Sequence, residues 1–241
     1  MRKFGLIGYP LGHSFSKKYF SEKFVREGIQ DCQFELYPIE SIAEFSQLID
    51  RESSLEGLSV TIPYKEQVIP YLDALDPACA QIGAVNCIRI RDGKKTGFNT
   101  DYLGFKQSLQ SWLGREIPNA LVLGTGGASK AVQQALRDLG VPFRIVSRSQ
   151  IDGQLTYAEL KEQPQWLASH PLIINTSPLG TYPQVEDMPD IPLEQLHAAN
   201  RVYDLVYNPP ITRLMQACIA RGGAAKNGQD MLELQAEAAW S

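Results

Sequence analysis

The sequence predicts an α/β fold of two domains: an N-terminal, mainly parallel α/β substrate domain and a Rossmann-type domain that binds a dinucleotide. Short apolar runs typical of buried strands alternate with stretches whose apolar residues recur at helical spacing. This alternation occurs in two blocks, and only the second contains a glycine-rich loop. Strands that alternate with helices favour a parallel sheet covered by helices. A chain of 241 residues is long enough for two small domains of this kind.

In the first block, three apolar runs are predicted to be strands, namely Phe4–Ile7, Phe34–Tyr37 and Gly57–Val60. Two helices are predicted between them, because apolar residues recur there at intervals of three and four. The first helix follows Ser16, and we expect four of its side chains to share one buried face: Tyr19, Phe20, Phe24 and Val25. The second carries Ile42, Phe45, Leu48 and Ile49. The aromatic stripe of the first helix is interpreted as core.

In the second block, the predicted strands are Ala120–Leu123, Phe143–Val146, Leu172–Ile174 and Val202–Val206. A helix with an apolar stripe at Ala131, Val132, Ala135, Leu136 and Leu139 follows the glycine loop. Helices are also predicted at 102–113 and at 229–240, and the last has no strand after it. We therefore predict that residues 1–103, completed by 227–241, form one domain and that residues 104–226 form the other.

Composition and charge exclude several classes of protein. The chain has 44% hydrophobic and 21% charged residues and a net charge of −4, which argues against disorder and against general binding of nucleic acid or anionic membrane. No apolar run approaches the ~18 residues of a membrane span. Gly8 and Pro10 come too early for a signal peptide, and the scattered cysteines fit a reducing cytoplasm. The four cysteines show no CxxC spacing, so we predict neither a metal site nor a disulfide framework.

The glycine loop is typical of a dinucleotide site. Gly124, Gly126, Gly127 and Ala128 stand between a predicted strand and a predicted helix. Glycines let backbone amides approach a pyrophosphate, and the helix N-terminus favours its negative charge. Ser129 stands where the usual pattern has Gly or Ala. The alternative interpretation is a tight turn between strand and helix that binds no ligand.

Arg148 indicates which dinucleotide is used. It follows the second strand of this block, where an NAD site usually has Asp or Glu on the ribose, and no carboxylate occurs before Asp152. A guanidinium suits the 2′-phosphate of NADP, and the hydroxyls of Ser147 and Ser149 flank it. The residues therefore favour NADP over NAD. The alternative is an ordinary surface arginine.

Polar segments that follow the predicted strands occur in an order that resembles the shikimate dehydrogenase family. They include Gly12-His13-Ser14-Phe15-Ser16, Ser59-Val60-Thr61-Ile62-Pro63-Tyr64-Lys65, Gly83-Ala84-Val85-Asn86, Asn99-Thr100-Asp101, Asn175-Thr176-Ser177-Pro178-Leu179-Gly180, Asp204-Leu205-Val206-Tyr207-Asn208-Pro209 and Met231-Leu232-Glu233-Leu234-Gln235. Together with the glycine loop, the resemblance runs from Ile7 to the last helix. No single segment is decisive, but eight in the same order are very specific.

The resemblance implies the NADP-dependent interconversion of shikimate and 3-dehydroshikimate, a step of chorismate and aromatic amino acid biosynthesis. It implies an active site in a cleft between the domains, with Lys65 and Asp101 as the catalytic pair. By the same resemblance, Ser14 and Ser16 hold the substrate carboxylate with Tyr207 nearby, and the ring hydroxyls bind Thr61, Asn86, Asp101 and Gln235. Gly228 matches a residue near the nicotinamide carboxamide. The implied partner is a small molecule, and the implied assembly is a monomer or homodimer.

Oxidation of a secondary alcohol requires an acid/base group, independently of the resemblance. When a secondary alcohol is oxidised, its hydroxyl loses a proton as hydride leaves the carbon, and a positioned Lys can take that proton. A carboxylate such as Asp101 can hold the same hydroxyl. Which of the two takes the proton is left open by the sequence. The alternative for Lys65 is a solvated side chain that opens a helix beginning near Glu66.

Some positions depart from the family, and two other functions compete. Ser59 and Ser147 stand where Asn is usual, Leu179 replaces a frequent Met, and the second basic residue after Arg148 is absent. One competing function is a quinate/shikimate dehydrogenase that accepts NAD, although Ser16 favours shikimate. The other is a nucleotide-binding regulatory module without catalysis, against which Lys65 and Asp101 argue.

His13 is interpreted as a loop residue, His170 and His197 as surface residues, and Cys87 as a buried small hydrophobe.

Overall fold

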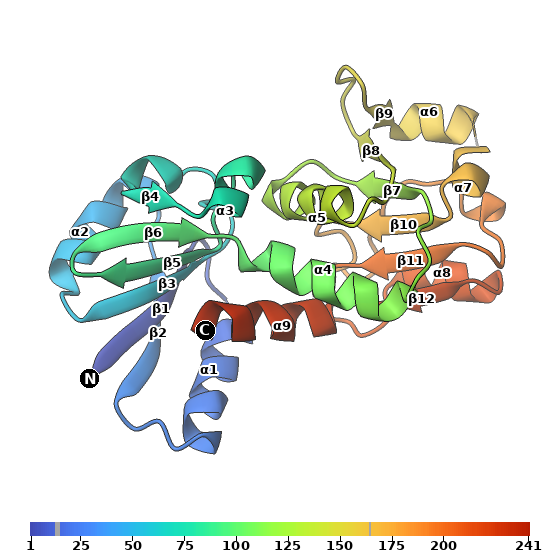
Figure 1. Ribbon diagram of the computed structural model, residues 1–241. Coiled ribbons are helices and arrows are strands. Elements are labelled where there is room, and N and C mark those ends of the chain that lie inside the picture. Colours follow the sequence, from blue (N-terminus) through green and yellow to red (C-terminus); the bar gives the residue numbers. More distant parts are fainter. Residues whose placement is uncertain (13–14, 164) are drawn as a thin grey trace. The chain divides into compact units, whose positions relative to one another are not determined.

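The computed structural model describes residues 1–12, 15–163 and 165–241, and these form two compact units (Figure 1). One unit comprises residues 1–100 and 236–241, and the other comprises residues 101–235. Each unit has its own six-stranded sheet with helices packed against it. The predicted two-domain α/β fold is therefore confirmed.

The sheet of the first unit is parallel in one half and antiparallel in the other. Its strand order is β2-β1-β3-β5-β6-β4. The parallel half consists of β1 (Arg2–Gly8), β2 (Cys32–Pro38) and β3 (Leu55–Val60). These are the three strands predicted from the sequence, each slightly longer than expected. A hairpin of β5 (Cys87–Arg91) and β6 (Lys94–Phe98) then pairs antiparallel with β3, and β4 (Ala74–Leu75) pairs parallel with β6.

The hairpin was not expected, although the sequence carries a signal for it. Asp92 and Gly93 form its two-residue turn, with φ of 51° and 73°. An Asp-Gly pair is the typical sequence of such a turn, because both residues tolerate positive φ there. The strands on either side are rich in charged residues, and this masks their alternation.

Helices cover both faces of the first sheet (Figure 1). On one face, a core built on Ile7, Leu58 and Val60 packs against Phe45 and Leu48. The elements on this face are η1 (Ile42–Glu44), α2 (Phe45–Arg51), η2 (Ile69–Tyr71) and α3 (Pro77–Ile82). On the other face lies α1 (Phe15–Arg26), whose buried residues are Phe20, Lys23 and Phe24. The expectation that Val25 is buried is wrong: it is 84% exposed, because it lies on the outer side of the helix.

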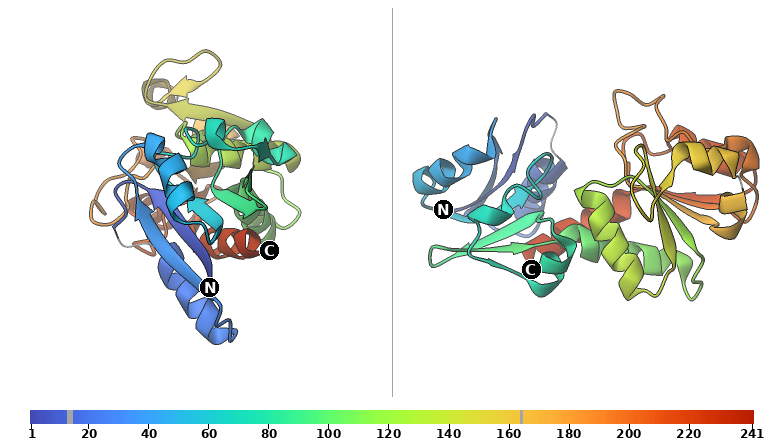
Figure 2. Two further views of the ribbon diagram at one scale, coloured as in Figure 1. Left: turned by 90° about the vertical axis from the view of Figure 1, so that its left-hand side faces the viewer. Right: turned by 90° about the horizontal axis from the view of Figure 1, so that it is seen from above.

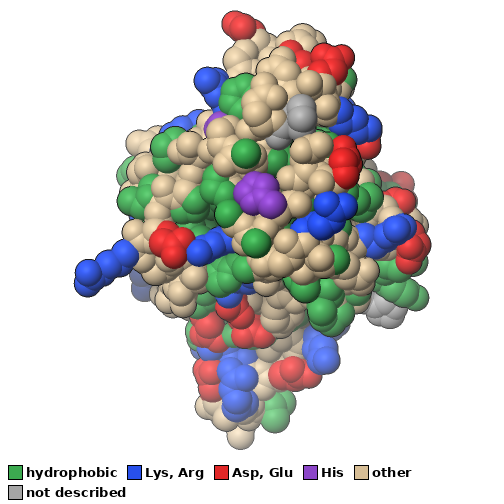
Figure 3. Space-filling model, turned by 90° about the vertical axis from the view of Figure 1, so that its right-hand side faces the viewer, with side chains coloured by type: hydrophobic (Ala, Val, Ile, Leu, Met, Phe, Trp, Pro, Cys, Tyr) green, Lys and Arg blue, Asp and Glu red, His purple; other side chains and the backbone are tan. Residues whose placement is uncertain are grey.

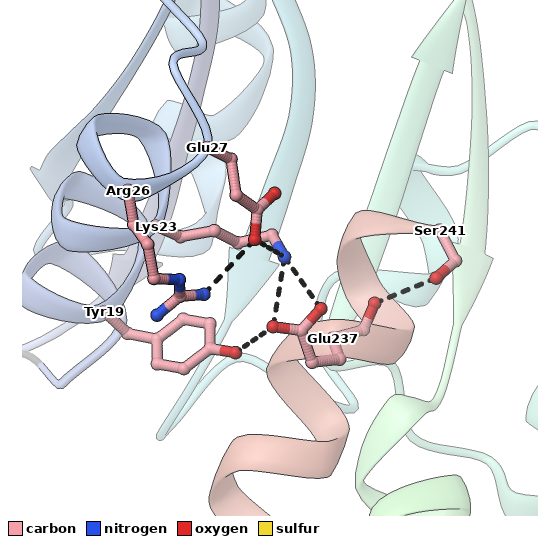
Figure 4. A network of polar contacts seen from close by, with 6 residues as sticks. All are labelled: Tyr19, Lys23, Arg26, Glu27, Glu237 and Ser241. Carbon is pink, nitrogen blue, oxygen red and sulfur yellow. Dashed lines mark hydrogen bonds and ion pairs between the residues drawn. The ribbon is translucent and has the colours of Figure 1, made fainter.

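The end of the last helix, α9 (Gln229–Trp240), is anchored to α1 (Figure 4). The carboxylate of Glu237 accepts hydrogen bonds from Tyr19 and from Lys23, whose Nζ lies 2.8 Å from Oε2. Lys23 is only 4% exposed and also bonds Glu27 at 2.9 Å, so its buried charge is paired twice. Trp240 adds aromatic contacts, with its ring centroid 5.2 Å from that of Phe4.

All strand pairs of the second sheet are parallel. The order is β12-β11-β10-β7-β8-β9. The bounds are β7 (Ala120–Leu123), β8 (Phe143–Ser147), β9 (Leu155–Thr156), β10 (Leu172–Asn175), β11 (Arg201–Asp204) and β12 (Ala224–Lys226). The four predicted strands are the four central ones. Their nearly continuous apolar sequences agree with burial on both faces.

Helices lie on both faces of this sheet as well (Figure 2). One face meets α4 (Thr100–Leu113) and α5 (Gly127–Asp138). The buried Tyr203 packs on Phe105 of α4 and donates a hydrogen bond to Ser108 at 2.8 Å. The other face packs against α6 (Tyr157–Glu162), α7 (Gln165–Ser169), η3 (Leu193–Gln195) and α8 (Arg213–Ala220).

Candidate functional site

The carboxyl edge of the first sheet gathers the predicted substrate residues. β1 and β3 run parallel with Ile7 opposite Val60, so the segments that follow them leave the sheet at the same edge. Thr61 is the first residue after β3, and its N–H donates to the carbonyl of Ile7 at 2.9 Å. The side chain of Thr61 is half-buried at this edge.

The unexpected hairpin brings two more segments to the same edge. Asn86 directly precedes β5, and its carbonyl accepts the N–H of Val60 at 2.8 Å. Its own N–H donates to the carbonyl of Phe98, the last residue of β6, at 3.1 Å. The residues after β6 therefore emerge beside Asn86, and these residues lead into Asp101.

The buried side chain of Asn86 holds the start of α4. Its Oδ1 accepts the N–H of Thr100 at 2.6 Å, and its Nδ2 donates to Thr100 Oγ1 at 2.9 Å. Asp101 comes next, in the first helical turn, where the helix dipole stabilises a carboxylate. Asn86, predicted to bind a substrate hydroxyl, thus also positions the chain next to Asp101. This second role could not be predicted without the pairing of β5 with β6.

Lys65 lies in a turn between β3 and η2. Its carbonyl accepts the N–H of Val85 at 2.7 Å, and the preceding Tyr64 is buried with its hydroxyl on the carbonyl of Ile39 at 2.6 Å. The Lys65 side chain is half-buried. The alternative interpretation placed Lys65 at the start of a helix near Glu66; no helix begins there, so that expectation is wrong. The backbone of Lys65 is instead fixed by contacts with distant parts of the chain.

One of the two serines predicted to bind the substrate carboxylate lies at the start of α1. Ser16 is the second residue of that helix and is half-buried. Ser14 and His13 lie outside the described residues. Tyr207 follows β11, is half-buried, and has its pKa raised by that burial.

Gln235 lies on α9 where this helix approaches α4 most closely. A Cβ added to Gly104 of α4 would lie 2.6 Å from the carbonyl oxygen of Met231 and 2.9 Å from the backbone nitrogen of Gln235. Only glycine therefore allows this contact. Gly104 is one helical turn from Asp101, so the contact places the helical segments of Asp101 and Gln235 side by side. Gly104 was not predicted from the sequence.

The glycine loop has the form that a pyrophosphate site requires. Gly124 directly follows β7 with φ of 117°, and Gly126 precedes the first residue of α5, Gly127, with Ala128 next. A Cβ added to Gly126 would meet nothing within 4 Å, so the space above it is open to a ligand. The buried Ser129 donates its hydroxyl to the carbonyl of Gly124 at 2.7 Å, which fixes the loop. These residues fit a dinucleotide phosphate.

Arg148 emerges at the same edge as the glycine loop. Gly124 N–H donates to the carbonyl of Val146 at 3.0 Å, which joins the ends of β7 and β8. The Arg148 side chain is exposed. Ser147 is 4% exposed, and its hydroxyl bonds the backbone of Ser149, accepting that N–H at 3.0 Å. The Ser147 hydroxyl therefore shapes the turn that presents Arg148, and its contact with the phosphate stays a prediction.

A buried carboxylate to which the sequence assigned no role of its own lies at the end of β11. Asp204 is fully buried, and its Oδ1 accepts bonds from Asn175 Nδ2 at 2.9 Å and from Val206 N–H at 3.1 Å. Its Oδ2 accepts the hydroxyl of Thr212 at 2.7 Å. Burial raises the pKa of Asp204 to about 6, although the three hydrogen bonds oppose that rise.

Asp204→Asn is expected to change how stability depends on pH. The usual pKa of Asp is 3.8 and that of folded Asp204 is about 6. Between these values the folded chain binds more protons at this residue than the unfolded chain, so its contribution to stability falls as pH rises. Relative to Asp204→Asn, the wild type should lose about 2–3 kcal/mol of unfolding free energy from about pH 4 to pH 7. Urea unfolding of both proteins at several pH values measures this, and a constant difference would contradict it.

Other surfaces carry ordinary features. In the part of the chain that the structure describes, no group of three or more His, Cys, Asp or Glu side chains could hold a metal ion. No helix among those residues is long and apolar enough to cross a membrane. Figure 3 shows histidine at the surface among side chains of both charge signs. His170 and His197 are half-buried, and so is Cys87, which is less buried than expected.

Comparison with known proteins agrees with this arrangement. Residues 6–88 match the model of the shikimate dehydrogenase substrate binding domain. A shikimate dehydrogenase (NADP(+)) of Halothermothrix orenii is 37% identical over 254 residues, which cover 96% of this chain and 87% of that protein. The chain belongs to the shikimate dehydrogenase family. The resemblance found in the sequence is thereby confirmed.

Two further members of the family are similar over nearly the whole chain. The shikimate dehydrogenase (NADP(+)) of Methanosphaera stadtmanae is 32% identical over 245 residues, covering 95% of this chain and 86% of that protein. The crystal structure of shikimate 5-dehydrogenase from Thermus thermophilus in complex with NADP(H) and shikimate has a TM-score of 0.86 at 28% identity. It covers 100% of this chain and 92% of that one. Both units therefore belong to the shikimate dehydrogenase fold.

Proposed function

We propose that this chain catalyses the reversible, NADP-dependent reduction of 3-dehydroshikimate to shikimate, a step of chorismate and aromatic amino acid biosynthesis. One observation carries the proposal. In a chain that matches shikimate dehydrogenases over almost its whole length, Thr61, Lys65, Asn86 and the segment leading into Asp101 gather at one edge of a sheet.

The proposed division of labour follows the predicted domains. Residues 1–103, completed by 227–241, bind substrate and supply the catalytic pair, and residues 104–226 bind the cofactor. The anchoring of Glu237 and Trp240 on α1 supports the inclusion of the last helix in the substrate domain. All the proposed residues come from one chain, so a monomer suffices and a homodimer would serve equally. We propose that the protein acts in the cytoplasm.

Lys65 and Asp101 are proposed as the acid/base pair. Oxidation of the substrate hydroxyl requires transfer of its proton as hydride departs, and an ammonium and a carboxylate can together hold that hydroxyl and exchange the proton. The backbone hydrogen bond of Lys65 and the place of Asp101 in the first turn of α4 fix the backbone from which each side chain extends. Thr61, Asn86 and Gln235 are proposed to bind the other ring hydroxyls.

The second unit is proposed to bind NADP, which supplies the hydride acceptor or donor. Gly124, Gly126, Gly127 and Ala128 would surround the pyrophosphate, and the N-terminus of α5 would favour its charge. Arg148 would bind the 2′-phosphate, with Ser149 beside it and Ser147 holding the turn. Gly228 would lie near the nicotinamide carboxamide.

A four-way assay tests the function. Reduction of NADP or NAD is followed with shikimate or quinate as substrate. We expect the highest kcat/KM for shikimate with NADP. Higher kcat/KM for quinate with NAD would identify the quinate/shikimate branch instead. Binding of NADP without turnover of either substrate would favour a regulatory module.

Ser16→Ala is expected to raise the KM for shikimate. The half-buried hydroxyl of Ser16, with Ser14, is proposed to bond the substrate carboxylate, and losing a bond to a charged group costs about 1–3 kcal/mol. This corresponds to a rise in KM of about 5- to 150-fold with little change in kcat. Ser21→Ala, an exposed serine of the same helix, is the control. If shikimate methyl ester and shikimate were turned over equally well, Ser16 would not read the carboxylate.

A further inference from the structure

Asp204 is a buried anion whose three hydrogen-bond donors are all uncharged. It is fully buried at the carboxyl end of β11 and is bonded by an amide, a backbone N–H and a hydroxyl. Removing a carboxylate from water is costly, and uncharged donors repay this only in part. A residue that serves the fold alone could be neutral here. We therefore look for a role of this carboxylate among the segments at the carboxyl end of β11.

The Asp204 carboxylate joins three separate segments. Through Asn175 it reaches the loop after β10, because Asn175 Oδ1 accepts the N–H and the hydroxyl of Ser177 at 3.0 and 2.7 Å. Through Val206 it fixes the backbone one residue before Tyr207. Through Thr212 it reaches the start of α8, where the Thr212 hydroxyl accepts the N–H of Met215 at 3.4 Å.

The joined segments extend to the cofactor glycines on both sides. The hydroxyl of Thr176 donates a hydrogen bond to the carbonyl of Leu123 at 2.8 Å. A Cβ added to Gly124 would lie 2.8 Å from the Oγ1 atom of this hydroxyl. On the other side, Gly228 N–H donates to the carbonyl of Val206 at 3.2 Å. A Cβ on Gly228 would collide with the carbonyl of Leu205. One continuous strip of contacts therefore runs from Gly124 to Gly228, with Asp204 in its centre.

We propose that Asp204 is a positioning residue for hydride transfer: its carboxylate holds the segments 175–177 and 205–207 in the arrangement that the nicotinamide end of the cofactor requires. Hydrogen bonds to a carboxylate are stronger than those between neutral groups, so the loops it joins are held more rigidly than a neutral residue would hold them. Asp204 does not touch the reacting atoms. The kinetic part of this inference rests on the proposed function.

The test compares Asp204→Ala, Asp204→Asn and a matched control. Asn retains the shape: its Oδ1 can accept the bonds from Asn175 and Val206, and its Nδ2 can donate to the Thr212 hydroxyl. The control is Asn200→Ala. Asn200 is also fully buried and stands before the opposite end of β11, where its Nδ2 donates to the carbonyl of Leu167 at 2.9 Å. Asn200→Ala removes a comparable buried polar group at the end of β11 that is opposite to Asp204.

Amide hydrogen exchange of the ligand-free proteins gives a readout that needs no activity. In Asp204→Ala, the amides of Ser177 and Val206 should exchange roughly 10-fold faster or more, whereas Asn200→Ala should leave them unchanged. Thr212→Val, which removes the donor to Oδ2 together with the acceptor of the Met215 N–H at the start of α8, should give a smaller increase in the same amides. If Asp204→Ala does not fold, Thr212→Val carries the test. Unchanged exchange of these two amides in every Asp204 and Thr212 variant would overturn the proposal.

The kinetic readout separates positioning from stability. Asp204→Ala should lower kcat with NADP and shikimate roughly 10-fold or more with little change in the KM for shikimate, because misplacement of the cofactor slows the chemical step. Asp204→Asn should restore kcat to within about 3-fold of the wild type. Asn200→Ala should lower the unfolding temperature but not kcat. If Asp204→Ala keeps its kcat, or Asn200→Ala loses as much, Asp204 is only a structural residue. If the wild type turns over neither shikimate nor quinate, the proposed function fails while the exchange experiment still decides what Asp204 holds.

Discussion

Lys65→Ala is expected to lower kcat for shikimate oxidation by about 10²-fold or more, because a positioned acid/base group typically contributes that much. Shikimate should still bind, since the hydroxyl and carboxylate ligands proposed for it remain. The turn that carries Lys65 should also survive, because its backbone bond to Val85 and the buried Tyr64 do not involve the Lys65 side chain. Steady-state kinetics with saturating NADP measure the split between kcat and KM.

Lys94→Ala is the matched control for this substitution. It removes an exposed lysine of the same unit at the hairpin turn, so any general effect of lost positive charge appears in it too. We expect its kcat to equal that of the wild type. If Lys65→Ala raises only KM and keeps kcat, then Lys65 binds substrate and Asp101 must carry the proton transfer alone.

The central parallel strands of the second sheet could be predicted from the sequence because each is a short, nearly uniform apolar run. The four predicted strands of the second unit are its four central strands, and the glycine loop was identifiable from its place between strand and helix. Ser129 shows the limit of pattern reading: it looked like a departure from the fingerprint, yet its hydroxyl fixes Gly124. The role of such a residue depends on a contact that only the folded loop creates.

The substrate edge shows more clearly what the sequence could not provide. Asn86 and Thr100 are separated by a hairpin. Its two strands carry Arg and Lys, so they lack the alternation of apolar and polar residues that would predict strands from the sequence. The mutual hydrogen bonds of Asn86 and Thr100 follow from the antiparallel register alone. Gly104 and the role of Asp204 were missed for the same reason, since Gly104 contacts Met231 and Asp204 binds Asn175, each more than 25 residues away in the chain. Local propensity carries no information about such partners.

Arg148→Ala is expected to remove most of the preference for NADP over NAD. A hydrogen-bonded contact between a guanidinium and phosphate is worth about 1.5–3 kcal/mol. This corresponds to a preference of roughly 10- to 150-fold in kcat/KM. Arg148 is exposed, the second basic residue is absent and the Ser147 hydroxyl is used within the turn, so we expect the lower end of that range. The kinetics with NAD should be nearly unchanged, because NAD has no 2′-phosphate to lose a contact.

The comparison of kcat/KM for both cofactors needs a control that changes charge without touching the turn. Arg144→Ala serves this purpose, because Arg144 is exposed on strand β8 and lies four residues before Arg148, which follows that strand. A long-range effect of positive charge on a phosphate would be similar in the two variants and would weaken with added salt. A direct contact would appear only in Arg148→Ala and would persist at high salt to a larger extent. Equal use of NAD and NADP by the wild type, or an equal loss with both cofactors in Arg148→Ala, would show that Arg148 does not read the 2′-phosphate.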